Sequence, residues 1–272
     1  MTQLPIPCAV LVLVRNAAAT IGSCLEGLRE FQRVIVLDGF STDATREIAA
    51  RFSNVHIVDQ DSAYLDENGM IKDFGAMRNV GLRHATEEWF LYIDSDEMLT
   101  PALVASIRAA TASSDADAYE VFRRFVVDGR PVLRSAVYPA THVRLARRSA
   151  IECFVKPIHE RFKLASSARV AMLEGDLLIP LPSAKALWPK YKRYLAIEAD
   201  CSVNMRLGVW FKWIFLRNVR SAIGVSARMA WVRIMPGAGM CLPFAYEAQF
   251  VAYSLCMITK TFPLGKRRYA RS

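Results

Sequence analysis

The stretch WFLYIDSDEMLT, residues 89–100, begins as an apolar strand and ends in polar and acidic side chains. Asp94, Asp96 and Glu97 place three carboxylates within four residues, where they repel one another. One interpretation is a polar loop after a core strand, in which an Asp or Ser caps the next helix. The other is a divalent-cation site at the carboxyl edge of a sheet, where open α/β proteins bind ligands. The rest of the sequence distinguishes between these two interpretations.

The length and the cysteine content of the chain indicate the broad class of protein. A chain of 272 residues can bury a full α/β core and still carry an appendage. The six cysteines are scattered without a close pair, and several lie in apolar runs. This pattern predicts reduced core cysteines of a cytosolic protein and not a disulfide or zinc framework. The first seven residues lack a basic start, so we expect no signal peptide.

Charge divides the chain into two parts. Residues 185–272 contain 15 Lys and Arg against three Asp and Glu, whereas the remainder has 20 against 23. Four of the five tryptophans also follow residue 185. We therefore expect one domain over residues 1–184 and a basic, aromatic C-terminal helical extension over 185–272.

The first part alternates between strand and helix patterns. Continuous apolar runs of strand length alternate with segments of helical periodicity, which predicts an α/β fold with a mainly parallel sheet flanked by helices. After residue 118 the pattern becomes β-rich, with a hairpin at Asp128-Gly129. The expected strands are 9–14, 33–37, 55–58 and 89–93, and the expected helices begin near 21, 43, 73 and 101.

Two strand ends carry acids. The second strand ends in Asp38 and the fourth in Asp94 and Asp96. Because the carboxyl ends of parallel strands meet at the same edge, these acids should face one crevice. Asp43 is expected to start the next helix, with Ser41 or Thr42 capping it, whereas Asp38 has no such structural task.

Three segments together resemble the family-2 glycosyltransferases, which have the GT-A nucleotide-sugar fold. They are VIVLDGFSTDAT (34–45), AMRNVGLRHA (76–85) and FLYIDSDE (90–97), in the order and spacing of that family. The resemblance covers about residues 8–100. The Asp-Ser-Asp-Glu ending and PIHERF (157–162) are most similar to bacterial lipopolysaccharide-core and related envelope glycosyltransferases. The first strand departs from the family, because residues 15–19 read RNAAA where relatives have Asn-Glu-Glu.

The resemblance implies a role for each matching residue in donor binding. Asp38 would contact the base or ribose of the nucleotide, and Arg78 would lie beside it, while Asn79 braces a loop. Asp94 would reach the ribose or the metal, with Ser95 in the nucleotide-sugar site. Asp96 would ligate Mg²⁺ or Mn²⁺ on the diphosphate. The chemistry is consistent, since a cation held by carboxylates neutralises the charge of a departing diphosphate.

The acceptor side is expected beyond the hairpin. Pro157-Ile158-His159-Glu160 places a His beside a carboxylate, a pair that in isolation is more often structural. The resemblance implies that Glu160 is the catalytic base of an inverting transfer and that His159 lies near the metal, phosphate or acceptor. Asp128 is the second candidate for the base. Residues 64–73 are polar and contain Gly, which is typical of a surface loop or of a flap over the donor.

The basic last third suggests a membrane surface. A predicted helix over 205–220 carries Arg206, Arg217 and Arg220 within about 60° of one another and is otherwise aliphatic and Trp-rich, as interfacial helices are. Alternatively, these helices pack on the catalytic domain with solvated arginines. No run reaches the roughly 18 uncharged residues of a spanning helix. We therefore expect peripheral or monotopic attachment to anionic lipid on the cytoplasmic face of the inner membrane.

The leading hypothesis is a metal-dependent glycosyltransferase of envelope polysaccharide biosynthesis. It would move a sugar from a nucleotide-diphosphate donor, with a UDP-sugar as the first choice, to a lipid-linked or lipopolysaccharide-type acceptor. One alternative is a nucleotidyltransferase, but 14–22 is no Gly-rich phosphate loop. The other is a non-catalytic membrane- or nucleic-acid-binding protein, suggested by a pI near 9.4. We expect no nucleic-acid partner, because the candidate site is acidic.

Overall fold

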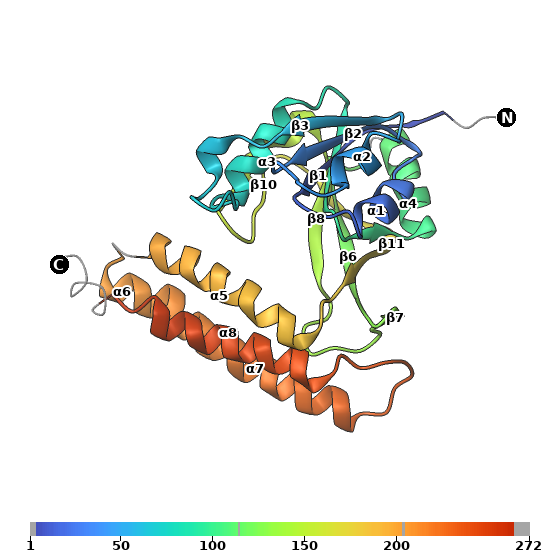
Figure 1. Cartoon of the computed structure of the whole chain (residues 1–272). Helices are drawn as coiled ribbons and strands as arrows, with labels where there is room; N and C mark the ends of the chain where they lie inside the picture. Colours follow the sequence, from blue (N-terminus) through green and yellow to red (C-terminus); the bar gives the residue numbers. More distant parts are fainter. Residues whose placement is uncertain (1–3, 114, 203–204, 264–272) are drawn as a thin grey trace. The chain divides into compact units, whose positions relative to one another are not determined.

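The computed structural model describes residues 4–113, 115–202 and 205–263 (Figure 1). They form two compact units. The first contains the described residues up to Arg124 together with Ala140–Pro180, and the second contains Phe125–Pro139 and the described residues after Pro180. The sequence assigns Phe125–Pro139 to the first part, whereas this segment packs within the second unit. A domain boundary after residue 184 stays a prediction.

The central sheet combines a parallel half and an antiparallel half. Its order is β3-β2-β1-β4-β8-β6-β11-β5, with β7 paired to β6. The strands β3, β2, β1 and β4 are parallel to one another, and β8 joins β4 antiparallel. The sheet strands are β1 (Ile6–Val14), β2 (Phe31–Asp38), β3 (Val55–Asp59), β4 (Trp89–Asp94), β5 (Met98–Leu99), β6 (Ala118–Val127), β7 (Arg130–Pro131), β8 (Thr141–Arg147) and β11 (Val170–Pro180); β9 (Ile151–Val155) and β10 (Arg161–Leu164) form a separate hairpin.

Helices occupy the places that the sequence predicts. Between the parallel strands lie α1 (Ile21–Glu26), α2 (Thr45–Ala49) and α3 (Phe74–Arg83), and α4 (Pro101–Ala112) follows β5. The expected helix over 43–52 is shorter than predicted, because the chain turns after Ala49 to begin β3. The hairpin at Asp128-Gly129 forms, and both turn residues have positive φ. Its second strand has only two residues, because Leu133 and Arg134 instead pair with Met240 and Leu242.

The core of the first unit depends on the alternation of side chains along β1. Ala9, Leu11 and Leu13 belong to one buried cluster, which also contains Met77 and Val80 of α3. The even-numbered β1 residues are equally buried and, because side chains alternate along a strand, point to the other face. The sheet is therefore covered on both faces in this region, as its continuous apolar strands predict.

The second unit is helical beyond Pro180. The sequence-predicted helix over 205–220 begins at Leu207, passes through a π-helical segment at Phe211–Phe215 and continues to Ile234. The helices of the second unit are α5 (Ala184–Cys201), α6 (Leu207–Trp210), α7 (Leu216–Ile234) and α8 (Phe244–Lys260). Helix α8 packs against both α5 and α7 (Figure 1). None of the described helices combines the length and the apolar character needed to cross a bilayer.

A buried acid joins parts of the second unit. Glu247 of α8 accepts hydrogen bonds from the Ser135 hydroxyl and the Ala136 amide and forms a 2.6 Å ion pair with Arg233 of α7. A carboxylate that is 1 % exposed needs such partners, because an unpaired buried charge is costly. The contacts explain why Phe125–Pro139 belongs with the helices.

Gly81 sets how closely α3 approaches β1. A Cβ there would lie 2.4 Å from Leu11 Cδ1, and Leu11 is fully buried. Gly81→Ala should lower the free energy of unfolding by about 1–2 kcal/mol, because overpacking outweighs the gain of about 1 kcal/mol in helix propensity. Chemical denaturation measures the change. Gly22→Ala in α1, whose new Cβ would meet Ile48 at an ordinary 3.5 Å, is the control and should not destabilise. Equal effects in the two variants would contradict this account of the packing.

Candidate functional site

Two acidic residues end the strands on either side of β1. Asp38 of β2 lies in register with Val14, and Asp94 of β4 with Leu13. With about 4.8 Å between neighbouring strands, the two backbones lie roughly 10 Å apart at one edge of the sheet. The predicted common edge is therefore confirmed, whereas the roles of these residues toward a ligand stay predictions.

The carboxylate of Asp38 is fully buried and organises the loop that follows it. It accepts hydrogen bonds from the Ser41 amide at 3.0 Å and from the Ser41 hydroxyl at 2.5 Å. It also forms a 2.9 Å ion pair with Arg46, which binds Asp59 as well. Asp38 thus holds the loop after β2 in place, a structural task that the sequence did not reveal.

The Ser41–Thr45 segment is joined to the loop after β1. The Asn16 and Ala17 amides donate to the side chains of Ser41 and Thr45, and the Asn16 side chain accepts from the Thr42 amide. The helix α2 begins at Thr45, two residues after the predicted Asp43, whose carboxylate accepts from the Thr45 amide at 3.0 Å. Capping by Ser41 or Thr42 is wrong, since their side chains serve Asp38 and Asn16.

Arg78 of α3 connects two of the predicted site carboxylates. Its Nε donates to Glu160 Oε1 and its Nη2 to Asp94 Oδ1, each at 2.6 Å. The guanidinium is 2 % exposed and lies 4.7 Å from the centre of the Tyr92 ring. Burial opposes the charged form, but Glu160 and Asp94 outweigh it and raise the pKa of Arg78. The Nη1 atom is buried without a hydrogen-bond partner among the described residues.

The segment that carries Glu160 is fixed against α3. Asn79 donates to the Phe154 carbonyl and accepts from the Phe154 amide, which confirms its predicted bracing role. The Pro157 carbonyl accepts from the Phe74 amide at 2.8 Å, and a Cβ at Gly75 would lie 2.5 Å from the Lys156 carbonyl. These contacts hold Glu160 within reach of Arg78.

Glu97, one of the three carboxylates within residues 94–97, has a structural role. It is 1 % exposed, accepts from the Asp94 amide at 3.0 Å, and pairs with Arg144 at 3.2 Å and Arg123 at 3.7 Å. Burial raises the pKa of Glu97 although Arg144 opposes this. Sequence reasoning missed this ion pair network. Its signal was the presence of arginines inside the otherwise apolar strand patterns of β6 and β8.

The acidic turn leaves Asp96 at the surface. The Glu97 amide donates to the Asp94 carbonyl at 3.0 Å, which closes the turn over Ser95 and Asp96. Ser95 is half-buried and Asp96 is exposed. Among the described residues no three His, Cys, Asp or Glu side chains gather as a metal cage. One or two carboxylates suit Mg²⁺ or Mn²⁺ brought in by a diphosphate, which supplies the other oxygens.

The histidines near Glu160 have distinct environments. His159 is exposed and has a φ of 53°, and Lys156 has a φ of 75°, values that non-glycine residues rarely adopt. His142 of β8 was not identified from the sequence as a site residue. Although part of its surface is exposed, burial together with the charges of Arg123 and Arg144 lowers the pKa of His142 to about 4. This imidazole is therefore neutral at pH 7.

The loop over residues 64–73 is tethered to the end of β1. Arg15 donates to the carbonyls of Asn68 and Gly69, and the Asp66 carboxylate accepts from the Asn68 and Met70 amides. An isolated bridge between Leu65 and Ile71 closes the loop. Movement of this loop over a donor stays a prediction.

Arg78→Ala tests the central ion pairs. The variant leaves Asp94 and Glu160 without their shared cation, so we expect the free energy of unfolding to fall by about 3–5 kcal/mol. Chemical denaturation at neutral pH measures it. Arg83→Ala, an exposed arginine on the same helix, should change stability by no more than about 0.5 kcal/mol. Similar midpoints for the two variants would show that the Arg78 pairs contribute little.

Comparisons with known proteins agree with this geometry. Residues 9–168 match the family model described as Glycosyl transferase family 2. LpsC, a lipopolysaccharide core biosynthesis glycosyltransferase of Rhizobium meliloti, is 24% identical over 151 residues, 53% of this chain and 52% of that protein. A TPR repeat-containing protein of Synechococcus elongatus is 29% identical over 154 residues, 56% of this chain and 34% of that protein. The chain thus spans about half or less of the length of these curated relatives.

A solved structure shares the fold. The mannosyltransferase PcManGT of Pyrobaculum calidifontis, in complex with GDP-Man and Mn²⁺, superposes with a TM-score of 0.54 at 14% identity, covering 100% of this chain and 89% of that chain. At this identity the likeness shows the fold alone. The family match extends over more than half of the sequence, and the chain therefore belongs to glycosyl transferase family 2 and has the GT-A fold.

Proposed function

We propose that the chain is a metal-dependent, inverting glycosyltransferase of envelope polysaccharide biosynthesis. It would transfer a sugar from a nucleotide-diphosphate donor, with a UDP-sugar as the first choice, to a lipid-linked or lipopolysaccharide-type glycan. The observation that carries the proposal is the arrangement at the end of β4: Asp96 is exposed on the acidic turn, while Asp94 shares Arg78 with Glu160. LpsC supports the acceptor class by its name.

On the donor side, Asp96 would hold the divalent cation. When bound, that ion would supply charge neutralisation at the departing nucleoside diphosphate. Asp94 and Ser95 lie on the same turn and contact the ribose or the nucleotide sugar. Asp38 and Arg78 are almost without exposed surface. They therefore act on the nucleotide by fixing the loops around it.

On the acceptor side, Glu160 takes the proton from the attacking hydroxyl. Its carboxylate is 15 % exposed and is oriented by the bond from Arg78. His159 is exposed next to it and binds the phosphate, the metal or the acceptor. The neutral His142 adds a hydrogen-bonding group to this side without a positive charge.

Asp96→Ala tests the metal site. Differential scanning fluorimetry of the wild type against UDP, GDP, CDP and dTDP, with and without Mn²⁺, should give a metal-dependent shift with one nucleotide. The variant should lose the metal-dependent part, because it removes the exposed carboxylate that we propose as the ligand of the cation. Glu47→Ala removes an exposed acid of α2 and should behave as the wild type. An unchanged shift in Asp96→Ala would place the cation elsewhere, and the absence of any nucleotide shift in the wild type would contradict the donor class.

Glu160→Gln tests the base. The variant keeps a side chain of the same size but cannot accept the proton, so we expect transfer to fall at least about 100-fold. The measurement is release of nucleoside diphosphate from the donor identified by fluorimetry, with purified bacterial lipopolysaccharide as acceptor. Donor affinity should stay within about twofold. The control is Glu152→Gln, which alters an exposed acid paired with Lys163 at 2.6 Å. Full activity of Glu160→Gln would move the base to another residue.

A further inference from the structure

The charged residues of the segment between α5 and α8 are all cationic. From residue 201 to 246 the sequence has no Asp or Glu, but it contains six cationic residues: Arg206, Lys212, Arg217, Arg220, Arg228 and Arg233. Within the part of the chain that the structure describes, Arg233 is the one of these six that forms an ion pair, with Glu247 of α8. A helix pair that served only to cover a core would normally carry charges of both signs on its outer surface.

One face of α7 packs inside the second unit. Asn218, Ala222, Val225 and Met229 are buried, and at about 100° per residue they fall within roughly 60° of one another. Val225 and Met229 form a cluster with Ala136, to which Phe250 of α8 contributes. This face is the ordinary inner face of an amphipathic helix.

The opposite face of α7 is apolar too. Leu216, Ile223, Trp231 and Ile234 lie within about 80° of one another, on the side of the helix away from the buried face. Their exposures are 42%, 65%, 62% and 77%. The preceding turns expose Phe211 at 47% and Trp213 at 61%. The outer face of a helix in water is normally polar, so this surface needs an apolar partner.

Cations border this apolar face. A groove of about 860 Å³ runs along the segment and is lined by eight residues, none of them acidic. At about 100° per residue, Arg217 and Arg228 lie on one flank of the apolar face and Arg220 lies within it. The lining residues are Lys212, Trp213, Leu216, Arg217, Arg220, Ser221, Gly224 and Arg228.

We propose that the outward face of α7, together with this cationic groove, docks on the surface of an anionic phospholipid bilayer. Leu216 and Ile234 are separated by 18 residues, or about 27 Å of helix, which gives an apolar stripe long enough to lie in the membrane plane. Trp213 and Trp231 suit the headgroup level, and the arginines and Lys212 pair with lipid phosphates. The helix lies in the interface and does not span it, in keeping with the composition of the described helices.

Charge favours lipid over a second copy of the chain. A two-fold dimer through this face would bring Arg217, Arg220 and Arg228 toward the same arginines of the partner. No carboxylate from residue 201 to 246 could neutralise them. An anionic lipid surface satisfies both the apolar stripe and the cationic flank.

The test is co-sedimentation of the full-length protein with extruded vesicles. The wild type should bind vesicles of phosphatidylcholine with 40 mol% phosphatidylglycerol at least tenfold more tightly than pure phosphatidylcholine, and 0.5 M NaCl should weaken the binding. Arg217→Gln/Arg220→Gln/Arg228→Gln should reduce the partition coefficient about 100-fold, since each cation near the surface contributes about a fivefold factor. Ile223→Glu/Trp231→Glu should reduce it at least tenfold.

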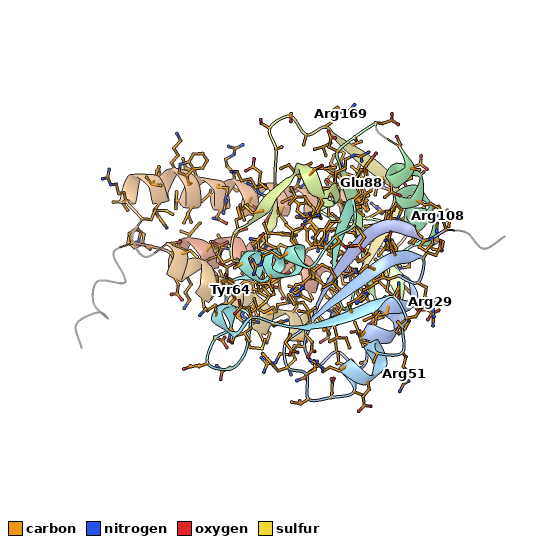
Figure 2. All side chains as sticks on the ribbon, turned by 90° about the horizontal axis from the view of Figure 1, so that it is seen from above. Arg29, Arg51, Tyr64, Glu88, Arg108 and Arg169 are labelled. Atoms are coloured by element: carbon orange, nitrogen blue, oxygen red, sulfur yellow. The ribbon has the colours of Figure 1, made fainter. Side chains whose placement is uncertain are left out.

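Two controls separate docking from folding and from catalysis. Arg51→Gln, an exposed arginine at the end of α2 (Figure 2), and Met172→Glu, which is 53% exposed on β11, should bind as the wild type. All variants should keep the wild-type thermal shift with nucleotide, so that a failed donor site and a failed docking surface are distinguishable. The proposal is overturned if both α7 variants bind vesicles like the wild type. It is also overturned if nuclease treatment abolishes co-sedimentation with vesicles. The same holds if the α7 substitutions convert a dimer to monomers without changing vesicle binding.

Discussion

The site depends on one buried guanidinium. Arg78 joins Asp94 at the end of β4 to Glu160 on the segment after β9. Without that cation, two negative charges would be left together in a partly buried place. The helix α3 can deliver Arg78 because Gly81 lets it lie close to β1 and Asn79 holds β9 beside it. Packing and charge thus act together to set the distance between the donor side and the proposed base.

A second set of ion pairs supports the first. Glu97 receives Arg123 from β6 and Arg144 from β8, and its carboxylate fixes the Asp94 amide. Arg144 also lies 4.5 Å from the centre of the Tyr92 ring, which Arg78 contacts as well. The parallel half of the sheet therefore ends in the acidic turn, and the antiparallel half supplies the two arginines that pair with Glu97.

The sequence predicted the parallel half well, because fully apolar strands and strand-ending acids are local signals. It also predicted that Asn79 braces a loop. It could not reveal the partners of Glu97, since periodicity does not say that β4 neighbours β8, and the arginines of β6 and β8 come 26 and 47 residues after Glu97. The same limit concealed the burial of Asp38, which depends on Arg46 in the following helix. In the last third, the sequence predicted an apolar helix rich in Arg and Trp over 205–220 but not its extension to Ile234.

The dependence of the acidic turn on later strands has a consequence for biogenesis. When residues 1–100 have emerged from the ribosome, Arg78, Asp94 and Asp96 are outside it, but Arg123, Arg144 and Glu160 are not. The emerging chain can pair β1 with β2 and β4 while its clustered carboxylates still lack their counter-charges. The ion pairs of the acidic turn are therefore completed late in translation, once the segment between β9 and β10 that carries Glu160 has emerged.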